Sequence, residues 1–218
     1  MTVDVASTMA GLLFWLIIVT NLASNQFGYQ TFGDLESEAI LHEIDEDPRR
    51  FKIGFALIII EHLCIILLAV MLFIAFNHLN LAFAVVWLVS RSSEGVIQIV
   101  EKRAYWRLLE VARQFSGAKG DERSELADLR VDILRSKRAN FLFAQILFAV
   151  GTLSYALLFA TEDVVPPLLA WFGVAAAILY GFGSGLTIRN PDSRAVWNIG
   201  GLCILLFEAI LGGWLLFS

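Results

Sequence analysis

Six apolar runs dominate the sequence, and each is long enough to cross a lipid bilayer, which takes about 20 helical residues at 1.5 Å each. They lie near residues 8–25, 52–77, 80–101, 139–160, 165–187 and 194–217. Hydrocarbon offers no hydrogen-bond partners to the backbone, so spanning segments of this kind fold as helices. We therefore predict an all-α polytopic membrane protein, with residues 1–218 forming a single transmembrane domain.

The composition agrees with a membrane location. The chain is 58% hydrophobic and 17% charged, whereas a soluble domain has about 45–50% apolar and about 25% charged residues. Cys64 and Cys203 lie in apolar runs without CxxC spacing, so no metal site is predicted. His62 is the only histidine well inside a span, which argues against a bis-histidine haem and leaves any cofactor unknown.

Local signals mark several helix starts. Asp47 followed by Pro48 predicts an N-cap and a first helical residue, and Ser7 with Thr8 is expected to cap the first span. The stretch 190–192 predicts a turn before the last span. Glycine-rich stretches in the last two spans predict close helix packing, with a cavity lining as the alternative.

The first long loop, residues 26–51, contains a short amphipathic segment. Asp34 is expected to cap an acidic helix whose apolar residues share one face: Leu35, Ile40, Leu41 and Ile44. We predict that this helix lies on the membrane surface.

The second long loop, residues 102–138, predicts a cytoplasmic amphipathic hairpin of two helices hinged at 116–120. Its apolar stripes are Tyr105, Leu108, Leu109 and Ala112, then Leu126, Leu129 and Ile133. The helices either extend the adjoining spans or form a docking surface for a partner, and the predicted partner contacts are Arg123, Arg130, Arg135 and Arg138. Mixed charges in the hairpin fit ion-paired helices near anionic lipid better than nucleic-acid binding.

The basic residues predict the orientation. Of the 16 lysines and arginines, all except Arg91 fall in or beside the loops 26–51, 102–138 and 188–194. The opposite side, which includes both termini, has none. The positive-inside rule therefore predicts a multi-pass protein of the cell membrane with both termini outside.

Polar side chains recur at similar depths inside the spans: Asn21, Glu61, His62, Arg91, Glu94, Gln98, Gln145 and Glu208. A charge at the bilayer centre costs at least about 2.5–3.5 kcal/mol, so we expect these groups to converge inside the protein, with Arg91 paired to nearby glutamates. If all four charged groups were ionised, three carboxylates would face one guanidinium. The cluster is either a structural polar lock or a site for a proton, ion or small ligand.

Several segments resemble a known family. AGLLFWLIIVTNLAS, VVWLVSRSSEGVIQIV, VVPPLLAWFGVAAAILYGFG and LLFEAILGGWLLF resemble the first, third, fifth and last helices of a domain-of-unknown-function family of six-helix prokaryotic integral membrane proteins. The resemblance implies that Arg91, Glu94 and Glu208 are polar family positions and that Pro166, Gly173 and Trp214 are framework. Members often begin with a basic stretch, which implies the opposite orientation, and this chain lacks that stretch.

These observations favour a non-catalytic membrane protein, a subunit or interaction partner of other membrane subunits or of its own copies. The alternative is a proton, ion or small-solute transporter or sensor that uses the intramembrane cluster. An enzyme ranks third, because the sequence has no phosphate-binding loop, HExxH, GxSxG or dinucleotide fingerprint.

Overall fold

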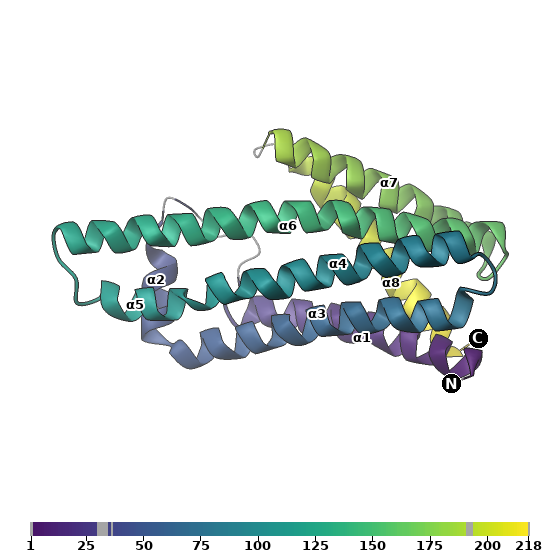
Figure 1. Cartoon of the computed structure of the whole chain (residues 1–218), viewed down its shortest axis with the longest axis horizontal. Helices are drawn as coiled ribbons and strands as arrows, with labels where there is room; N and C mark the ends of the chain where they lie inside the picture. The colour runs from purple at the N-terminus through teal and green to yellow at the C-terminus, as the bar shows by residue number, and fades with distance from the viewer. Residues whose placement is uncertain (1, 30–34, 36, 191–193, 218) are drawn as a thin grey trace. The chain divides into compact units, whose positions relative to one another are not determined.

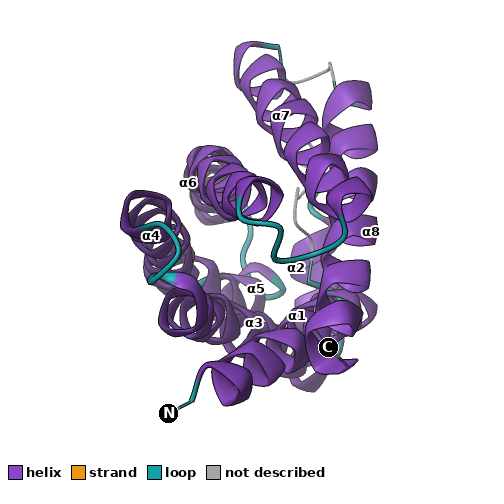
Figure 2. Ribbon diagram, turned by 90° about the vertical axis from the view of Figure 1, so that its right-hand side faces the viewer, coloured by secondary structure: helices purple, strands orange, loops and turns teal. Residues whose placement is uncertain are grey.

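The computed structural model describes residues 2–29, 35, 37–190 and 194–217, and all regular structure in these ranges is helical (Figures 1 and 2). The helices are α1 (Val3–Gln26), α2 (Ala39–Glu46), α3 (Pro48–Phe76), α4 (Leu81–Trp106), α5 (Leu108–Phe115), α6 (Asp121–Thr161), α7 (Pro167–Arg189) and α8 (Ala195–Phe217). Within the described part, six segments are long and apolar enough to cross a membrane: α1, α3, α4 continued by α5, α6, α7 and α8. The chain is an all-α polytopic membrane protein, as its apolar runs predicted.

The helix starts follow local chemistry. α3 begins at Pro48, and the Oδ1 atom of Asp47 accepts a hydrogen bond from the Arg50 amide at 2.9 Å, which confirms the predicted cap. The predicted cap of the first span is wrong. α1 starts at Val3, where the hydroxyl of Thr2 accepts from the Val5 amide at 3.4 Å, and this places residues 7 and 8 inside the helix.

Two other predicted signals fall outside the described residues. They are the cap at Asp34 and most of the turn at 190–192.

The chain divides into two compact units. Unit 1 comprises Met1–Ile18, Leu63–Val96 and Leu142–Ser218, and unit 2 comprises Val19–His62 and Ile97–Phe141. Most of the long helices therefore contribute one part to each unit, and each unit has its own buried apolar core.

In unit 1, the core is built from aromatic and aliphatic side chains. The Tyr155 ring lies 6.3 Å from Phe14 and 6.0 Å from Phe207, measured between centroids. α7 and α8 pack side by side along much of their length (Figures 1 and 2). Both helices also expose large apolar side chains, including Leu168, Phe182 and Ile199, as helices that face lipid do.

Glycines permit the close approach of α7 and α8. A Cβ atom built on Gly183 would lie 2.6 Å from the Trp197 backbone nitrogen, and one built on Gly200 would lie 2.7 Å from the Tyr180 Cα. A Cβ on Gly173 would lie 2.4 Å from the Phe207 ring. Small residues at helix contacts are the usual means of close packing between membrane helices.

In unit 2, α2 packs on α5 (Figure 1). Ile40, Leu41 and Ile44 are buried in the same apolar cluster as α5 residues such as Leu108 and Phe115. Protein, and not lipid, therefore covers the apolar face of this short helix, and its location at the membrane surface stays a prediction. Its apolar stripe packs against the apolar stripe of α5, and this contact removes both stripes from solvent.

The region predicted as a hairpin comprises the end of α4, α5, a connection at 116–120 and the first part of α6. The predicted stripe on the first arm is buried, with Tyr105 and Leu108 almost inaccessible. On the second arm Leu126 and Ile133 are buried, and Leu129 is partly buried against the same cluster. The 3.6-residue periodicity therefore located the inward faces of both arms correctly.

Gly183→Ala and Gly185→Ala form a matched test of this packing. We expect Gly183→Ala to destabilise the protein by about 1–3 kcal/mol, because its new methyl group meets the α8 backbone. A Cβ on Gly185 meets no atom within 4 Å, so Gly185→Ala should stabilise by up to about 1 kcal/mol through helix propensity. Unfolding of detergent-solubilised variants measures both, and equal effects would contradict the close contact.

Candidate functional site

Arg91 and Glu94 form an ion pair inside unit 1. Both lie on α4, three residues apart, so they share one face of the helix. The Arg91 Nη1 atom donates to Glu94 Oε2 at 2.6 Å, and the residues are only 3% and 2% exposed. Both charged groups are therefore buried inside the protein, and they neutralise each other within one helical turn.

The surroundings of the pair come from two further helices. α6 contributes Phe148 and Gly151. The Arg91 guanidinium lies 4.2 Å from the centre of the Phe148 ring, and a Cβ built on Gly151 would lie 2.7 Å from the Arg91 Cγ atom. From α8, Glu208 interacts electrostatically with Arg91 and accepts a hydrogen bond from the Tyr155 hydroxyl at 3.4 Å. We call Arg91, Glu94, Phe148, Tyr155 and Glu208 the Arg91 cluster.

Gln145 lies beside this cluster. It accepts a hydrogen bond from the Tyr180 hydroxyl, which lies within electrostatic range of Arg91, Glu94 and Glu208. The site thus draws on α4, α6, α7 and α8.

The Arg91 cluster contains two carboxylates and one guanidinium. Arg91 gives its hydrogen bond to Glu94, whereas Glu208 accepts a hydrogen bond from the neutral phenol of Tyr155. If both carboxylates were ionised, the cluster would carry one surplus negative charge, and such a charge is costly in an apolar interior. A proton or a cation at Glu208 would remove that cost.

A second buried polar group lies in unit 2. Lys102 donates to Glu101 Oε2 at 2.6 Å, and its ammonium lies 5.5 Å from the centre of the Tyr29 ring. The ammonium of Lys137 lies 4.4 Å from the Tyr29 ring and 4.6 Å from the Tyr105 ring. These five residues form the lysine–tyrosine cluster, in which cation–π contact takes the place of part of the lost hydration.

Tyr29 reaches this cluster because of how α1 ends. The Tyr29 amide donates to the Ser24 carbonyl at 3.0 Å, and the Gly28 amide donates to the Asn25 carbonyl at 3.1 Å. This is a Schellman motif, which needs a left-handed residue after the helix, and Gly28 has φ of +82°. Burial raises the pKa of Tyr29 well above its usual value, so its ring stays neutral beside the lysines.

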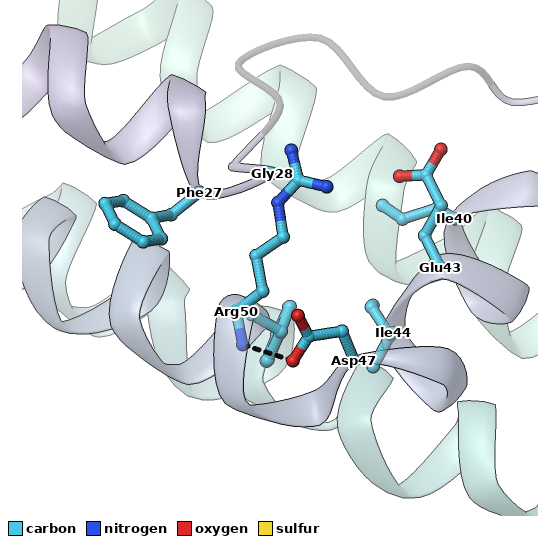
Figure 3. Close-up of a pocket in the computed structure, with 8 residues that line it drawn as sticks. Phe27, Gly28, Ile40, Glu43, Ile44, Asp47 and Arg50 are labelled. Atoms are coloured by element: carbon cyan, nitrogen blue, oxygen red, sulfur yellow. Dashed lines mark hydrogen bonds between the residues drawn. The ribbon is translucent and has the colours of Figure 1, made fainter.

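Arg50 adds a second stabilising contact at the same helix end. Its guanidinium donates to the Gln26 carbonyl at 3.0 Å, where a cation complements the helix dipole. Figure 3 shows the side chain extending from α3 toward Gly28. The adjacent cavity, lined in part by Phe27 and Phe51, has a volume of about 20 Å³, which is room for about one water.

The remaining predicted intramembrane residues belong to unit 2. Glu61 accepts two hydrogen bonds from the Asn21 amide, both at 3.1 Å, and interacts electrostatically with Lys102. His62 bonds the Ile58 carbonyl through Nδ1, and Gln98 is 5% exposed. A pairing of Glu61 with Arg91 stays a prediction.

The four arginines predicted as partner contacts differ in exposure. Arg130 is 3% exposed, and it donates to the backbone carbonyls of Leu35 and Ser37. Arg123 bonds Glu38 at 2.9 Å and lies over the Phe115 ring. Arg138 is partly buried, and Arg135 is exposed beside Asp132. Arg130 therefore serves the chain's own fold, and Arg135 is the most accessible of the four.

Sequence reasoning missed the lysine–tyrosine cluster, because it counted Lys102 and Lys137 only as loop charges. The available signal was position on the apolar stripe. Lys137 follows Ile133 by four residues and Lys102 precedes Tyr105 by three, so both lysines lie on inward faces. A basic residue in register with buried apolar residues predicts a buried, partnered charge.

The described residues contain no group of three or more His, Cys, Asp or Glu side chains placed to hold a metal ion. Neither Cys64 nor Cys203 forms a disulfide with another described residue.

A family model described as "Domain of unknown function (DUF4386)" matches residues 9–218, which is almost the whole chain. The chain belongs to the DUF4386 family. This confirms the resemblance found in the helix sequences and places the Arg91 cluster and the lysine–tyrosine cluster within the DUF4386 region. Neither the curated proteins nor the solved structures gave a match.

A double-mutant cycle tests the Arg91–Glu94 pair. Arg91→Met and Glu94→Gln keep the side-chain volumes, and we expect each to destabilise by about 3–5 kcal/mol, because each leaves a buried charge without its partner. The double variant should lose much less than the sum of the two. Ser92→Ala, on the same helix turn, is the control and should change stability by less than about 1 kcal/mol. Additive single effects would show that the pair is not coupled.

Proposed function

We propose that this DUF4386 protein is a non-catalytic membrane subunit or interaction protein, and that the Arg91 cluster is its internal polar lock. The observation that carries the proposal is that the chain itself surrounds Arg91. Its charge pairs with Glu94, its guanidinium lies on Phe148, and its stem lies on Gly151. A guanidinium used in this way fixes the positions of α4 and α6 relative to each other within unit 1.

The polar lock has a physical rationale in a membrane. Apolar side chains pack against one another hardly better than against lipid, so they specify helix register weakly. The Arg91–Glu94 pair lies within α4 and moves with that helix, so the register is specified by the contacts that Arg91 makes with Phe148 and Gly151 on α6. Glu208 and Tyr155 extend the same requirement to α8 within unit 1.

The proposed partner surface is the exposed, charged side of the first part of α6. Arg135 and Asp132 are exposed there, together with acidic residues such as Glu122, Glu125 and Asp128. The inward apolar stripe of this segment is already covered by the chain's own α5 and neighbouring residues. A partner would therefore recognise charge more than apolar surface, which suits a reversible contact.

Co-purification tests the proposal. Full-length protein extracted gently from native membranes should elute with a second membrane protein in a fixed ratio, identified by mass spectrometry. We expect the charge reversals Arg135→Glu and Asp132→Lys, made separately, to weaken that complex by about tenfold. Arg113→Glu, an exposed position on α5, is the control. A complex that survives both reversals would contradict the proposed surface.

A second candidate function rests on the surplus carboxylate. Two glutamates share one guanidinium in the Arg91 cluster, and Glu208 interacts electrostatically with both members of the pair. That arrangement suits a carrier or sensor of a proton, cation or small cationic solute. A chain that elutes alone, or only with copies of itself, would contradict the subunit proposal and favour this second function.

We also propose that the protein resides in the cell membrane with both termini outside, on the basis of the one-sided basic residues. Accessibility labelling tests the orientation in a Cys64→Ala, Cys203→Ala background. In intact cells, a membrane-impermeant thiol reagent should label Thr2→Cys and leave Ser116→Cys unlabelled until the membrane is opened. The reverse pattern would mean that the termini lie inside.

A further inference from the structure

A groove in unit 2 changes along its length from apolar to basic. It lies between α3 and α4, opens outward and has a volume of about 700 Å³. Isoleucines line one part, among them Ile59, Ile60 and Ile99. Lys52 and Arg103 line the other part, together with Lys102 of the lysine–tyrosine cluster.

The basic residues gather at one end because the two helices contribute opposite ends. Lys52 lies near the start of α3, and Arg103 lies in the last turn of α4. At 1.5 Å per residue, Ile60 is about 12 Å further along α3 and Ile99 is about 6 Å back along α4. The groove therefore joins a cationic end to an aliphatic stretch long enough for part of an acyl chain.

Two cations at that end are available to a ligand. Lys102 gives its hydrogen bond to Glu101, whereas Lys52 and Arg103 are exposed and form no ion pair with the described residues. Among the described residues, no carboxylate lines the groove. A group that fills it must therefore be anionic at one end and apolar along the rest.

Aromatic side chains mark the level at which the charged end lies. Trp106 is 39% exposed, and its ring lies 4.5 Å from the Phe55 ring at the basic end of the groove. Tryptophan is enriched at the membrane–water interface, where lipid headgroups lie. The basic end of the groove is thus expected at headgroup depth and its isoleucines at acyl-chain depth.

We propose that this groove binds one anionic phospholipid, with the phosphate between Lys52 and Arg103 and an acyl chain along the isoleucines. A basic residue close to an anionic lipid strengthens binding by roughly fivefold. Two such residues should therefore favour an anionic lipid over a zwitterionic one of the same chain length by at least about tenfold.

Native mass spectrometry of the delipidated full-length protein measures this preference. The protein is titrated with phosphatidylglycerol or with phosphatidylcholine carrying the same acyl chains. We expect one tightly bound phosphatidylglycerol, and about twentyfold weaker binding of it to Lys52→Ala/Arg103→Ala. The matched control, Arg113→Ala/Lys119→Ala, removes two exposed cations outside the groove, so its affinity should change less than twofold.

Two further measurements separate the parts of the site. Ile60→Trp fills the apolar stretch and should weaken binding of both lipids, whereas Leu67→Trp, an exposed position outside the groove, should not. Inorganic phosphate at matched ionic strength should not displace the lipid. Equal affinity for the two lipids, equal losses in the groove and control variants, or displacement by phosphate would each overturn the proposal.

Discussion

The cost of placing a charge in a low-dielectric interior governs much of this protein's architecture. Arg91 cannot lose its proton under ordinary conditions, so its charge must be balanced wherever the chain places it. Glu94, one helical turn away, supplies that balance. The arginine stem then lies where Gly151 leaves room, so the pair depends on a glycine on α6 as well as on the carboxylate. At this position the charge of Arg91 has to be balanced and its stem has to fit against α6, so both requirements must be met together.

The two buried polar clusters meet the same requirement with different chemistry. Arg91 presents a planar guanidinium, which binds a carboxylate at one edge and rests a face on Phe148. Lys137 carries a compact ammonium, which lies over the rings of Tyr29 and Tyr105. Those rings are placed by backbone features, above all the left-handed Gly28. An arginine–lysine exchange at either position would therefore not be conservative.

The sequence predicted the fold better than the sites, for a physical reason. The six apolar runs and the stripes on the hairpin are patterns of many residues, so one residue that departs from the pattern does not change the predicted helix or its buried face. The depth estimate correctly indicated that Arg91, Glu94 and Glu208 would be buried. Their partners Phe148 and Gly151 have no comparable signal, because an aromatic ring or glycine in a membrane helix has many ordinary uses. The sequence did not show that α5 covers the apolar stripe of α2, because such a stripe does not reveal whether lipid or protein covers it.

Burial of basic residues bears on how orientation is inferred from charge. Lys102, Arg130 and Lys137 are almost inaccessible in the folded chain, so they cannot bind lipid headgroups freely there. The positive-inside bias, however, acts while segments insert, before such residues are packed. Without these three, the loops on the basic side still hold twelve lysines and arginines, and the opposite side still holds none. The orientation argument therefore does not depend on which of these charges the fold later buries, whereas the lipid-binding argument depends on the exposed Lys52 and Arg103.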